Sequence, residues 1–146
     1  MIMFFRNILV PYDGSKNSSR AFKIAIDMAK KYDSKIIGIA CIDVIYRGQW
    51  YYDSDYYADK IKKQKEIVKK SIANLEKSAK KEGIDFTFEV FQSRSVVEKI
   101  ITFAKTKKID LIVMGSHGRT GFDKVLLGSV ANGVAQRVKC HVMIVK

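Results

Sequence analysis

Residues 115–130, "GSHGRTGFDKVLLGSV", place four glycines, a histidine, an arginine and a lysine directly after the apolar run "DLIVM". Gly115 and Gly118 lack side chains, so they can adopt positive φ and let backbone N–H groups approach a ligand closely. Gly128 and Ser129 precede a short predicted helix, whose first N–H groups and positive dipole end favour phosphate. The serine hydroxyl could cap this helix or bind a phosphate oxygen. The pattern predicts a polyphosphate site.

Charged side chains accompany these glycines. His117, Arg119 and Lys124 lie between Gly115 and Gly128 and could neutralise an anionic ligand. Asp13 lies far earlier, in the turn sequence "PYDGS", and could reach a ribose hydroxyl or a phosphate-bound magnesium ion. The alternative is a glycine-rich connection that binds nothing, because the stretch matches neither the P-loop ending nor the dinucleotide spacing. The second anchor at Asp13 favours a nucleotide site.

Strands and helices that could position these residues alternate along the chain. Apolar runs rich in branched and aromatic residues predict strands at residues 4–12, 35–44, 85–92, 109–116 and 140–146. Capping signals mark the helices between them: Ser15 before the first helix, Gly83 after the second, and a capping box of Ser95 and Glu98 before the third. Strict alternation predicts an open parallel α/β sheet with helices on both faces, which binds ligands beyond the carboxyl ends of its strands.

The second predicted helix carries much of the positive charge. Residues 60–81 contain nine lysines and two glutamates. An apolar stripe predicts that one face is buried and that the lysines are solvated; its members are Ile61, Val68, Ile72, Leu75 and Ala79. Lysine reads bases poorly and no aromatic residues interleave with the run, which argues against specific nucleic-acid binding. Residues 45–58, rich in aromatic side chains, predict a loop that packs on the domain's own core or contacts a ligand or partner.

Length and composition bound the class of protein. The chain has 146 residues, 47% of them hydrophobic, and a formal net charge of +12. We expect one domain over residues 1–146, with no membrane-spanning segment because no apolar run approaches 18 residues. The N-terminus does not resemble a signal peptide, so we expect a cytoplasmic location. Cys41 and Cys140 show neither metal-ligand nor disulfide spacing.

The spacing of Gly115, Gly118, Gly128 and Ser129 resembles the nucleotide signature of the ATP-binding branch of the universal stress proteins, and "ILVPYDGSKNSSRA" resembles that family's opening segment. The resemblance covers essentially the whole chain. It implies a Rossmann-like five-stranded sheet of order 3-2-1-4-5, ATP between strands one and four, and a homodimer joined through the last strand. The apolar "VMIV" run of that strand supports the dimer, because pairing would remove an exposed edge.

The family's nucleotide-binding positions carry over to strand ends and one helix start. Pro11 and Asp13 would flank the ribose and triphosphate, with Asp13 also near magnesium, and the backbone of Cys41 would meet the adenine edge. The remaining ribose and phosphate contacts would come from Gly115, His117, Gly118, Gly128, Ser129 and Val130. Arg119 and Lys124 are added from charge and position alone.

The residues favour nucleotide binding over rapid turnover. A lone histidine in a phosphate loop, here His117, more often donates a hydrogen bond than removes a proton. We therefore expect an ATP-dependent regulatory or stress-response module, with at most slow hydrolysis and an unknown protein partner. The alternative is a magnesium-dependent phosphohydrolase or nucleotidyl-transfer enzyme, in which Asp13 holds Mg²⁺ and His117 assists the chemistry. A third hypothesis is a dimeric interaction protein of the branch that lacks the glycine signature.

Overall fold

The computed structural model describes residues 4–43, 54–118 and 127–146, in which strands and helices alternate. The strands are β1 (Asn7–Pro11), β2 (Lys35–Asp43), β3 (Phe86–Ser93), β4 (Leu111–Gly115) and β5 (His141–Val145). The helices are α1 (Lys16–Tyr32), α2 (Ser54–Lys81), α3 (Val96–Thr106) and α4 (Ser129–Arg137). All strand pairs are parallel and the sheet order is β3-β2-β1-β4-β5. The predicted open sheet, and the order that the resemblance implies, are confirmed.

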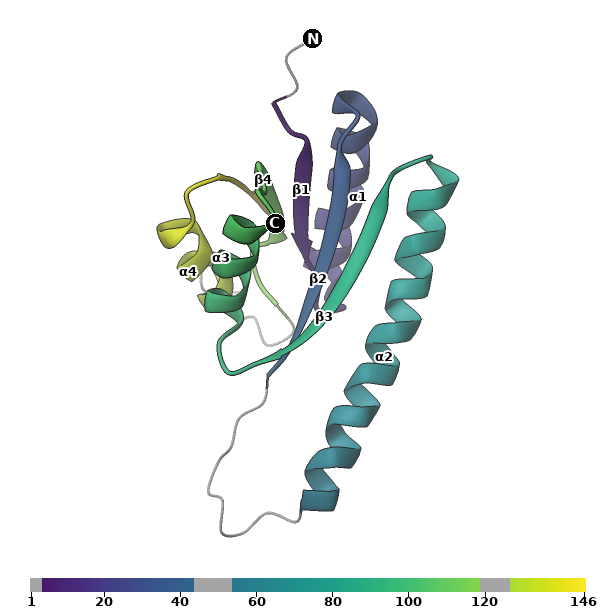
Figure 1. Ribbon diagram of the computed structural model, residues 1–146, viewed down its shortest axis with the longest axis vertical. Coiled ribbons are helices and arrows are strands. Elements are labelled where there is room, and N and C mark those ends of the chain that lie inside the picture. Colours follow the sequence, from purple (N-terminus) through teal and green to yellow (C-terminus); the bar gives the residue numbers. More distant parts are fainter. Residues whose placement is uncertain (1–3, 44–53, 119–126) are drawn as a thin grey trace.

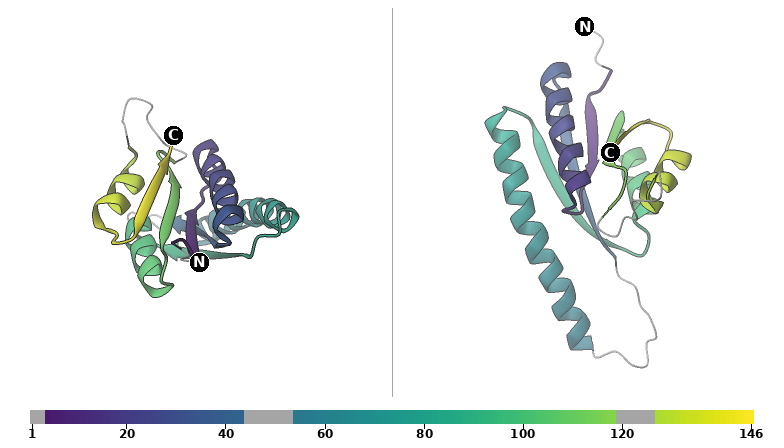
Figure 2. Two further views of the ribbon diagram at one scale, coloured as in Figure 1. Left: turned by 90° about the horizontal axis from the view of Figure 1, so that it is seen from above. Right: turned by 180° about the vertical axis from the view of Figure 1, so that it is seen from behind.

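Helices α1 and α2 cover one face of the sheet, and α3 and α4 cover the other (Figures 1 and 2). Residues 8–10 of β1 show why the middle of a strand in this sheet is continuously apolar. Ile8 and Val10 belong to the core beneath α1 and α2, whereas Leu9 belongs to the core beneath α3 and α4, and all three are 0% exposed. A strand covered on both faces needs apolar side chains in both directions, which explains its continuous apolar run.

The crossover direction reverses between β1 and β4. The chain moves outward from β1 through β2 to β3 with α1 and α2 on one face, then returns past β1 to β4 and β5 with α3 and α4 on the other. Parallel crossovers are right-handed, so a reversal of direction also changes the face that the helices cover. The connections that leave β1 and β4 therefore diverge, and a crevice opens between them at the carboxyl ends.

The boundaries of α2 and α3 test the predicted caps. Gly83 follows α2 with φ of 70°, as expected of a glycine that ends a helix. Ser95 is the N-cap of α3 and accepts a hydrogen bond from the Glu98 N–H. The second half of the predicted capping box is wrong, because the Ser95 N–H donates to Ser93 Oγ at 3.2 Å and the Glu98 carboxylate pairs with Arg137.

Strand β1 begins at Asn7 rather than at residue 4, where the apolar run begins. The N–H groups of Arg6 and Asn7 both donate to Asp110 Oδ2, each at 2.9 Å. One carboxylate thus satisfies two backbone donors at the point where β1 joins the sheet and Asn7 pairs with Lys35 of β2.

Helix α2 is longer than predicted. It begins at Ser54, inside the stretch expected to be a loop, and its 28 residues span roughly 42 Å. Figure 1 shows it reaching past the carboxyl end of the sheet. Of the predicted apolar stripe, Leu75 and Ala79 are buried, whereas Val68 is half-buried. The rest of the aromatic segment, residues 45–53, lies outside the described residues.

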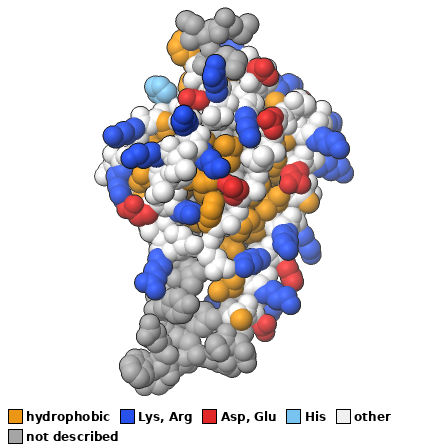
Figure 3. Space-filling view, viewed as in Figure 1, with side chains coloured by type: hydrophobic (Ala, Val, Ile, Leu, Met, Phe, Trp, Pro, Cys, Tyr) orange, Lys and Arg blue, Asp and Glu red, His pale blue; other side chains and the backbone are white. Residues whose placement is uncertain are grey.

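On the face drawn in Figure 3, lysine and arginine side chains are scattered around apolar side chains, with fewer carboxylates among them. Cys41 and Cys140 are free thiols, as expected. Within the described parts of the chain, no three metal-ligating side chains gather in one place. None of the described helices combines the length and the apolar character that a membrane span requires.

Because β4 lies inside the sheet, truncating one of its buried side chains should weaken the whole fold. Ile112 is 0% exposed, and we expect Ile112→Ala to lower the free energy of unfolding by about 2–5 kcal/mol. Ile67→Ala is the matched control, because Ile67 is 49% exposed on α2 and its truncation should cost less than about 1 kcal/mol. Urea denaturation measures both, and equal losses would contradict the assigned core.

Candidate functional site

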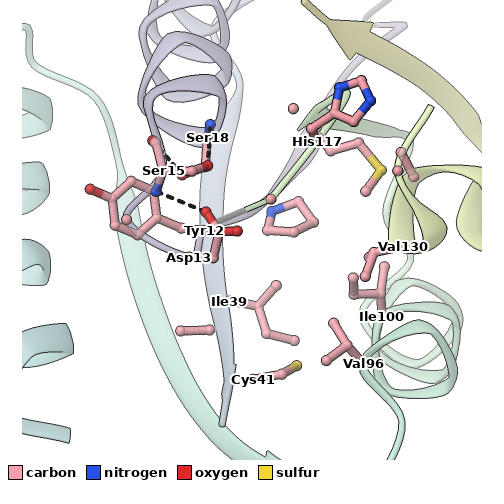
Figure 4. Close-up of a pocket in the computed structure, with 18 of the residues that line it drawn as sticks. Tyr12, Asp13, Ser15, Ser18, Ile39, Cys41, Val96, Ile100, His117 and Val130 are labelled. Atoms are coloured by element: carbon pink, nitrogen blue, oxygen red, sulfur yellow. Dashed lines mark hydrogen bonds between the residues drawn. The ribbon is translucent and has the colours of Figure 1, made fainter. Parts of the chain in front are cut away.

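A cavity of about 850 Å³ lies at the carboxyl ends of β1, β2 and β4 (Figure 4). The turn after β1 and the loop after β4 border it, together with the starts of α1, α3 and α4 and one face of α2. Every predicted site residue that the structure describes lines this cavity: Pro11, Asp13, Cys41, Gly115, His117, Gly118, Gly128, Ser129 and Val130. Arg119 and Lys124 lie outside the described residues.

The turn after β1 fixes Asp13 and closes the start of α1. Asp13 Oδ1 accepts a hydrogen bond from the Ser15 N–H at 2.9 Å, and Gly14 between them has φ of 82°. Ser15 is the N-cap of α1, as predicted, and its Oγ accepts from the Ser18 N–H at 3.1 Å. The α1 terminus is therefore occupied by the protein's own side chain, so an anion would meet fewer open amides there.

Gly118 faces the Asp13 carboxylate across the crevice. A Cβ at Gly118 would lie 2.6 Å from Asp13 Oδ2, nearer than real Cβ contacts allow. The absence of a side chain at Gly118 therefore lets the β4 loop lie close to the Asp13 carboxylate.

Gly115 has a packing role that its place in the glycine stretch did not reveal. A Cβ there would lie 2.9 Å from the backbone carbonyl carbon of Asn17 and 3.1 Å from the Ser18 nitrogen. Gly115 thus lets α1 pack closely on the end of β4. Gly115 and Gly118 do not use the positive φ that glycine can adopt, because Gly14 and Gly83 are the glycines with positive φ in the described ranges. Space for neighbouring atoms, not backbone conformation, explains both glycines.

The start of α4 lacks a side-chain cap. Gly128 is the N-cap, and its own N–H donates to the Ser116 carbonyl at 2.7 Å. Ser129, the first helical residue, is exposed, and no side chain of the described residues caps this terminus, so the capping role considered for its hydroxyl is wrong. The first-turn amides of Ser129, Val130 and Ala131 border the cavity and lack partners within the helix. This arrangement suits an anion.

His117 is held by contacts to its neighbours. Its Nδ1 lies 3.1 Å from Ser116 Oγ, and its carbonyl accepts a hydrogen bond from Asn17 Nδ2 at 3.3 Å. The buried Ser116 donates its N–H to the Val145 carbonyl of β5 at 2.8 Å. Figure 4 shows the imidazole at the opposite side of the cavity from Cys41. The imidazole therefore lies in the phosphate half of the predicted site, where it can donate a hydrogen bond.

The backbone of Cys41 is directed into the cavity by the strand pattern. In β2, the Ile36 N–H donates to the Asp85 carbonyl beside β3, whereas the Ile39 carbonyl accepts from the Tyr12 N–H on the side of β1. Backbone groups alternate in direction along a strand, so those of Cys41 turn to the same side as Ile39. Because β1 has already ended at Pro11, they meet the cavity instead of another strand.

The Cys41 side chain contributes to an apolar wall. Burial raises the pKa of the thiol to about 11, and the nearby Lys99 ammonium only partly offsets this effect. The thiol is therefore protonated at neutral pH and packs as a small apolar group. The same wall continues through Val96 and Ile100 of α3 and Met114 of β4.

One wall of the cavity was missed by the sequence analysis. Gln64, Ile67, Val68 and Ser71 of α2 line it, at helical spacings of three, four and seven residues. Only Val68 was assigned to an inward face. The spacing itself was a usable signal, but the exposed lysines around it favoured a solvated surface.

Comparison with known proteins places the chain in a family. The model of the universal stress protein family matches residues 4–146. The chain belongs to the universal stress protein family. Universal stress protein MJ0531 of Methanocaldococcus jannaschii is 34% identical over 148 residues, which cover 97% of this chain and 82% of that protein. The resemblance in the glycine stretch and the opening segment is thus confirmed at the level of the family.

Solved structures of similar proteins share the fold. Protein MJ0577 has a TM-score of 0.83 and 26% identity, with 99% of this chain and 97% of that chain covered. A universal stress protein solved in complex with cAMP has a TM-score of 0.68 and 25% identity, with 97% and 96% covered. The Rossmann-like sheet of this chain is therefore the fold of its family.

Alanine substitutions at Gly115 and Gly118 should lower the free energy of unfolding by different amounts. Gly115→Ala presses a methyl group against the backbone of α1, so we expect the free energy of unfolding to fall by about 1–3 kcal/mol. Gly118→Ala meets the end of the Asp13 side chain, which can turn aside, so the loss should be below about 1 kcal/mol. Urea denaturation compares the two. Equal destabilisation would refute the separate roles given to them.

Proposed function

We propose that the cavity binds ATP and that the protein is an ATP-binding regulatory or stress-response module. The observation that carries this proposal is the contrast between two helix starts at one crevice. Ser15 caps α1, whereas α4 begins at Gly128 without a side-chain cap. An anion at the start of α4 would complete the hydrogen bonds that no side chain of the described residues supplies. The crevice and the open helix start together suit a phosphate chain.

The remaining lining suits the other parts of the nucleotide. The apolar wall beside Cys41 would hold the adenine ring, and the inward backbone groups of Cys41 would pair with the adenine edge. Pro11 and Asp13 would border the ribose. Gly118 leaves room for the phosphates, and His117 would donate a hydrogen bond to them. The relative solved with cAMP supports an adenine nucleotide as the ligand class.

A magnesium ion would arrive with the nucleotide. Asp13 is the single carboxylate among the described lining residues, and the described chain holds no preformed cluster of ligands. Mg²⁺ in phosphate sites is held mainly by phosphate oxygens, water and one or two carboxylates. The site fits that pattern, with Asp13 as the protein ligand. Arg119 and Lys124 would add positive charge to the same region.

The proposed activity is binding with at most slow hydrolysis. Rapid hydrolysis requires a residue that positions or deprotonates water, and His117 is instead tied to Ser116 by the 3.1 Å contact at Nδ1. Nucleotide state would then act through the loops at the crevice or through a homodimer. The sheet edge at β5, where Met143 is 36% exposed, would supply the dimer contact and leave other surfaces for a protein partner.

Cysteine labelling offers a direct test of where ATP binds. We expect saturating Mg²⁺-ATP to slow the reaction of Cys41 with N-ethylmaleimide and to leave Cys140 unchanged, as measured by peptide mass spectrometry. Burial also raises the pKa of Cys140, which makes it the internal control. Because the Cys41 pKa is about 11, its labelling rate should rise about tenfold per pH unit between pH 8 and 10, where only the thiolate reacts.

A substitution at Gly118 completes the test. Gly118→Val places a branched side chain against Asp13 and should weaken ATP binding at least about tenfold, which abolishes protection of Cys41 at ATP concentrations that protect the wild type. Unchanged labelling of Cys41 in wild-type protein with added Mg²⁺-ATP would contradict the proposed site.

A further inference from the structure

The cavity reaches both faces of the sheet, and the proposed nucleotide occupies only one side. Ile39 and Cys41 belong to the core beneath α3 and α4. Because side chains alternate along a strand, Ala40 and Ile42 point to the opposite face, and both also line the cavity. We call the part on the α2 face the α2-side lobe; its lining residues are Tyr12, Ala40, Ile42, Gln64, Ile67, Val68 and Ser71.

Tyr12 forms the inner boundary of the α2-side lobe. It is half-buried against the core beneath α1 and α2, and its ring meets Phe88 edge-on with centroids 6.4 Å apart. Figure 4 shows Tyr12 on the side away from Val96 and Ile100. None of the α2 residues in the lobe is needed by the proposed nucleotide pose. The lobe therefore offers surface that the nucleotide leaves unused.

The lobe exists because α2 packs on the sheet only along its second half. Leu75 and Ala79 are 8% and 1% exposed, whereas Ile67, two turns earlier, remains 49% exposed although it lines the cavity. A large aliphatic side chain left open toward a concave surface is typical of a binding site. Aliphatic and aromatic side chains make up most of the lobe, so it suits an apolar body.

Positive charge is concentrated on the part of α2 that borders the lobe. Residues 59–70 of α2 carry six lysines against Asp59 and Glu66, a net charge of +4. Lys63 and Lys70 lie one helical turn to either side of Ile67, and residues so spaced are neighbours on a helix surface. Asp13, the carboxylate of the described lining, borders the other half of the cavity beside Gly118. An anionic head at the lobe's mouth would meet lysine ammonium groups.

We propose that the α2-side lobe is a second ligand site, which binds a small apolar anion: an aromatic or short aliphatic body with one carboxylate, sulfonate or phosphate group. The apolar wall of Ile42, Ile67 and Val68 buries the body, and the lysines of α2 attract the head. The inference is independent of the nucleotide, because it uses a different face of the sheet.

Two fluorescent probes that differ only in charge test the proposal. 8-Anilinonaphthalene-1-sulfonate carries the anionic head, and N-phenyl-1-naphthylamine has the same rings without it. We expect the folded wild-type protein to bind the sulfonate, and Ile67→Glu to weaken that binding at least about tenfold, because it places a carboxylate in the lobe. Ala73→Glu is the matched control, since it adds the same charge to an exposed position off the lobe and should have little effect.

Further variants distinguish the contribution of the anionic head from that of the apolar body, and this site from the proposed nucleotide site. The double variant Lys63→Gln, Lys70→Gln should weaken the sulfonate and leave the neutral probe unchanged, whereas Lys77→Gln should affect neither. Gly118→Val and saturating ATP should leave the sulfonate bound, so failure of the nucleotide proposal would not imitate failure of this one.

Several results would overturn the proposal. These are no sulfonate binding to the wild type, equal binding to Ile67→Glu, or displacement by ATP. A dimer that Ile67→Glu dissolves, in the absence of probe binding, would assign this face to a second copy of the chain.

Discussion

The reversal of crossover direction between β1 and β4 is the constraint on which the site depends. Right-handed crossovers send the chain after β1 to α1 on one face and the chain after β4 to α4 on the other. The chain therefore leaves the adjacent strand ends at Pro11 and Gly115 in different directions, and both ends line the cavity. The fold produces a crevice here whatever its loops contain, and the loop residues decide what it binds.

Within that crevice, some glycines and helix starts stabilise the fold, whereas others remain available to a ligand. Gly115 lets α1 approach β4, whereas Gly118 lets the β4 loop approach Asp13. Ser15 closes one helix start, and Gly128 leaves the other without a side-chain cap. A ligand with negative charge at one end and an apolar ring at the other matches these features in order, from α4 to the wall near Cys41.

Much of the fold could be predicted because its signals are local. Strands buried on both faces have continuous apolar runs, and the Ser15 cap depends on residues only three positions apart. The strand order depends on contacts between distant segments, so it came from the resemblance to a family. The role of Gly115 was inaccessible for the same reason, since the atoms that crowd it belong to Asn17 and Ser18, about a hundred positions earlier.

The predicted site positions converge on one cavity because strand ends and helix starts in this fold share an edge. The wall contributed by α2 could not be foreseen in the same way. Whether Ile67 is packed, solvated or open to a cavity depends on how far α2 separates from the sheet, and the amphipathic pattern is compatible with each outcome.

The most direct test of the nucleotide proposal is to denature the freshly purified protein, without added nucleotide, and to identify what is released by chromatography and mass spectrometry. We expect release of intact ATP, which would show both that the cavity is occupied and that the protein hydrolyses ATP slowly. Release of ADP instead would favour the hydrolase alternative. An empty protein that also fails to bind added Mg²⁺-ATP would contradict the account.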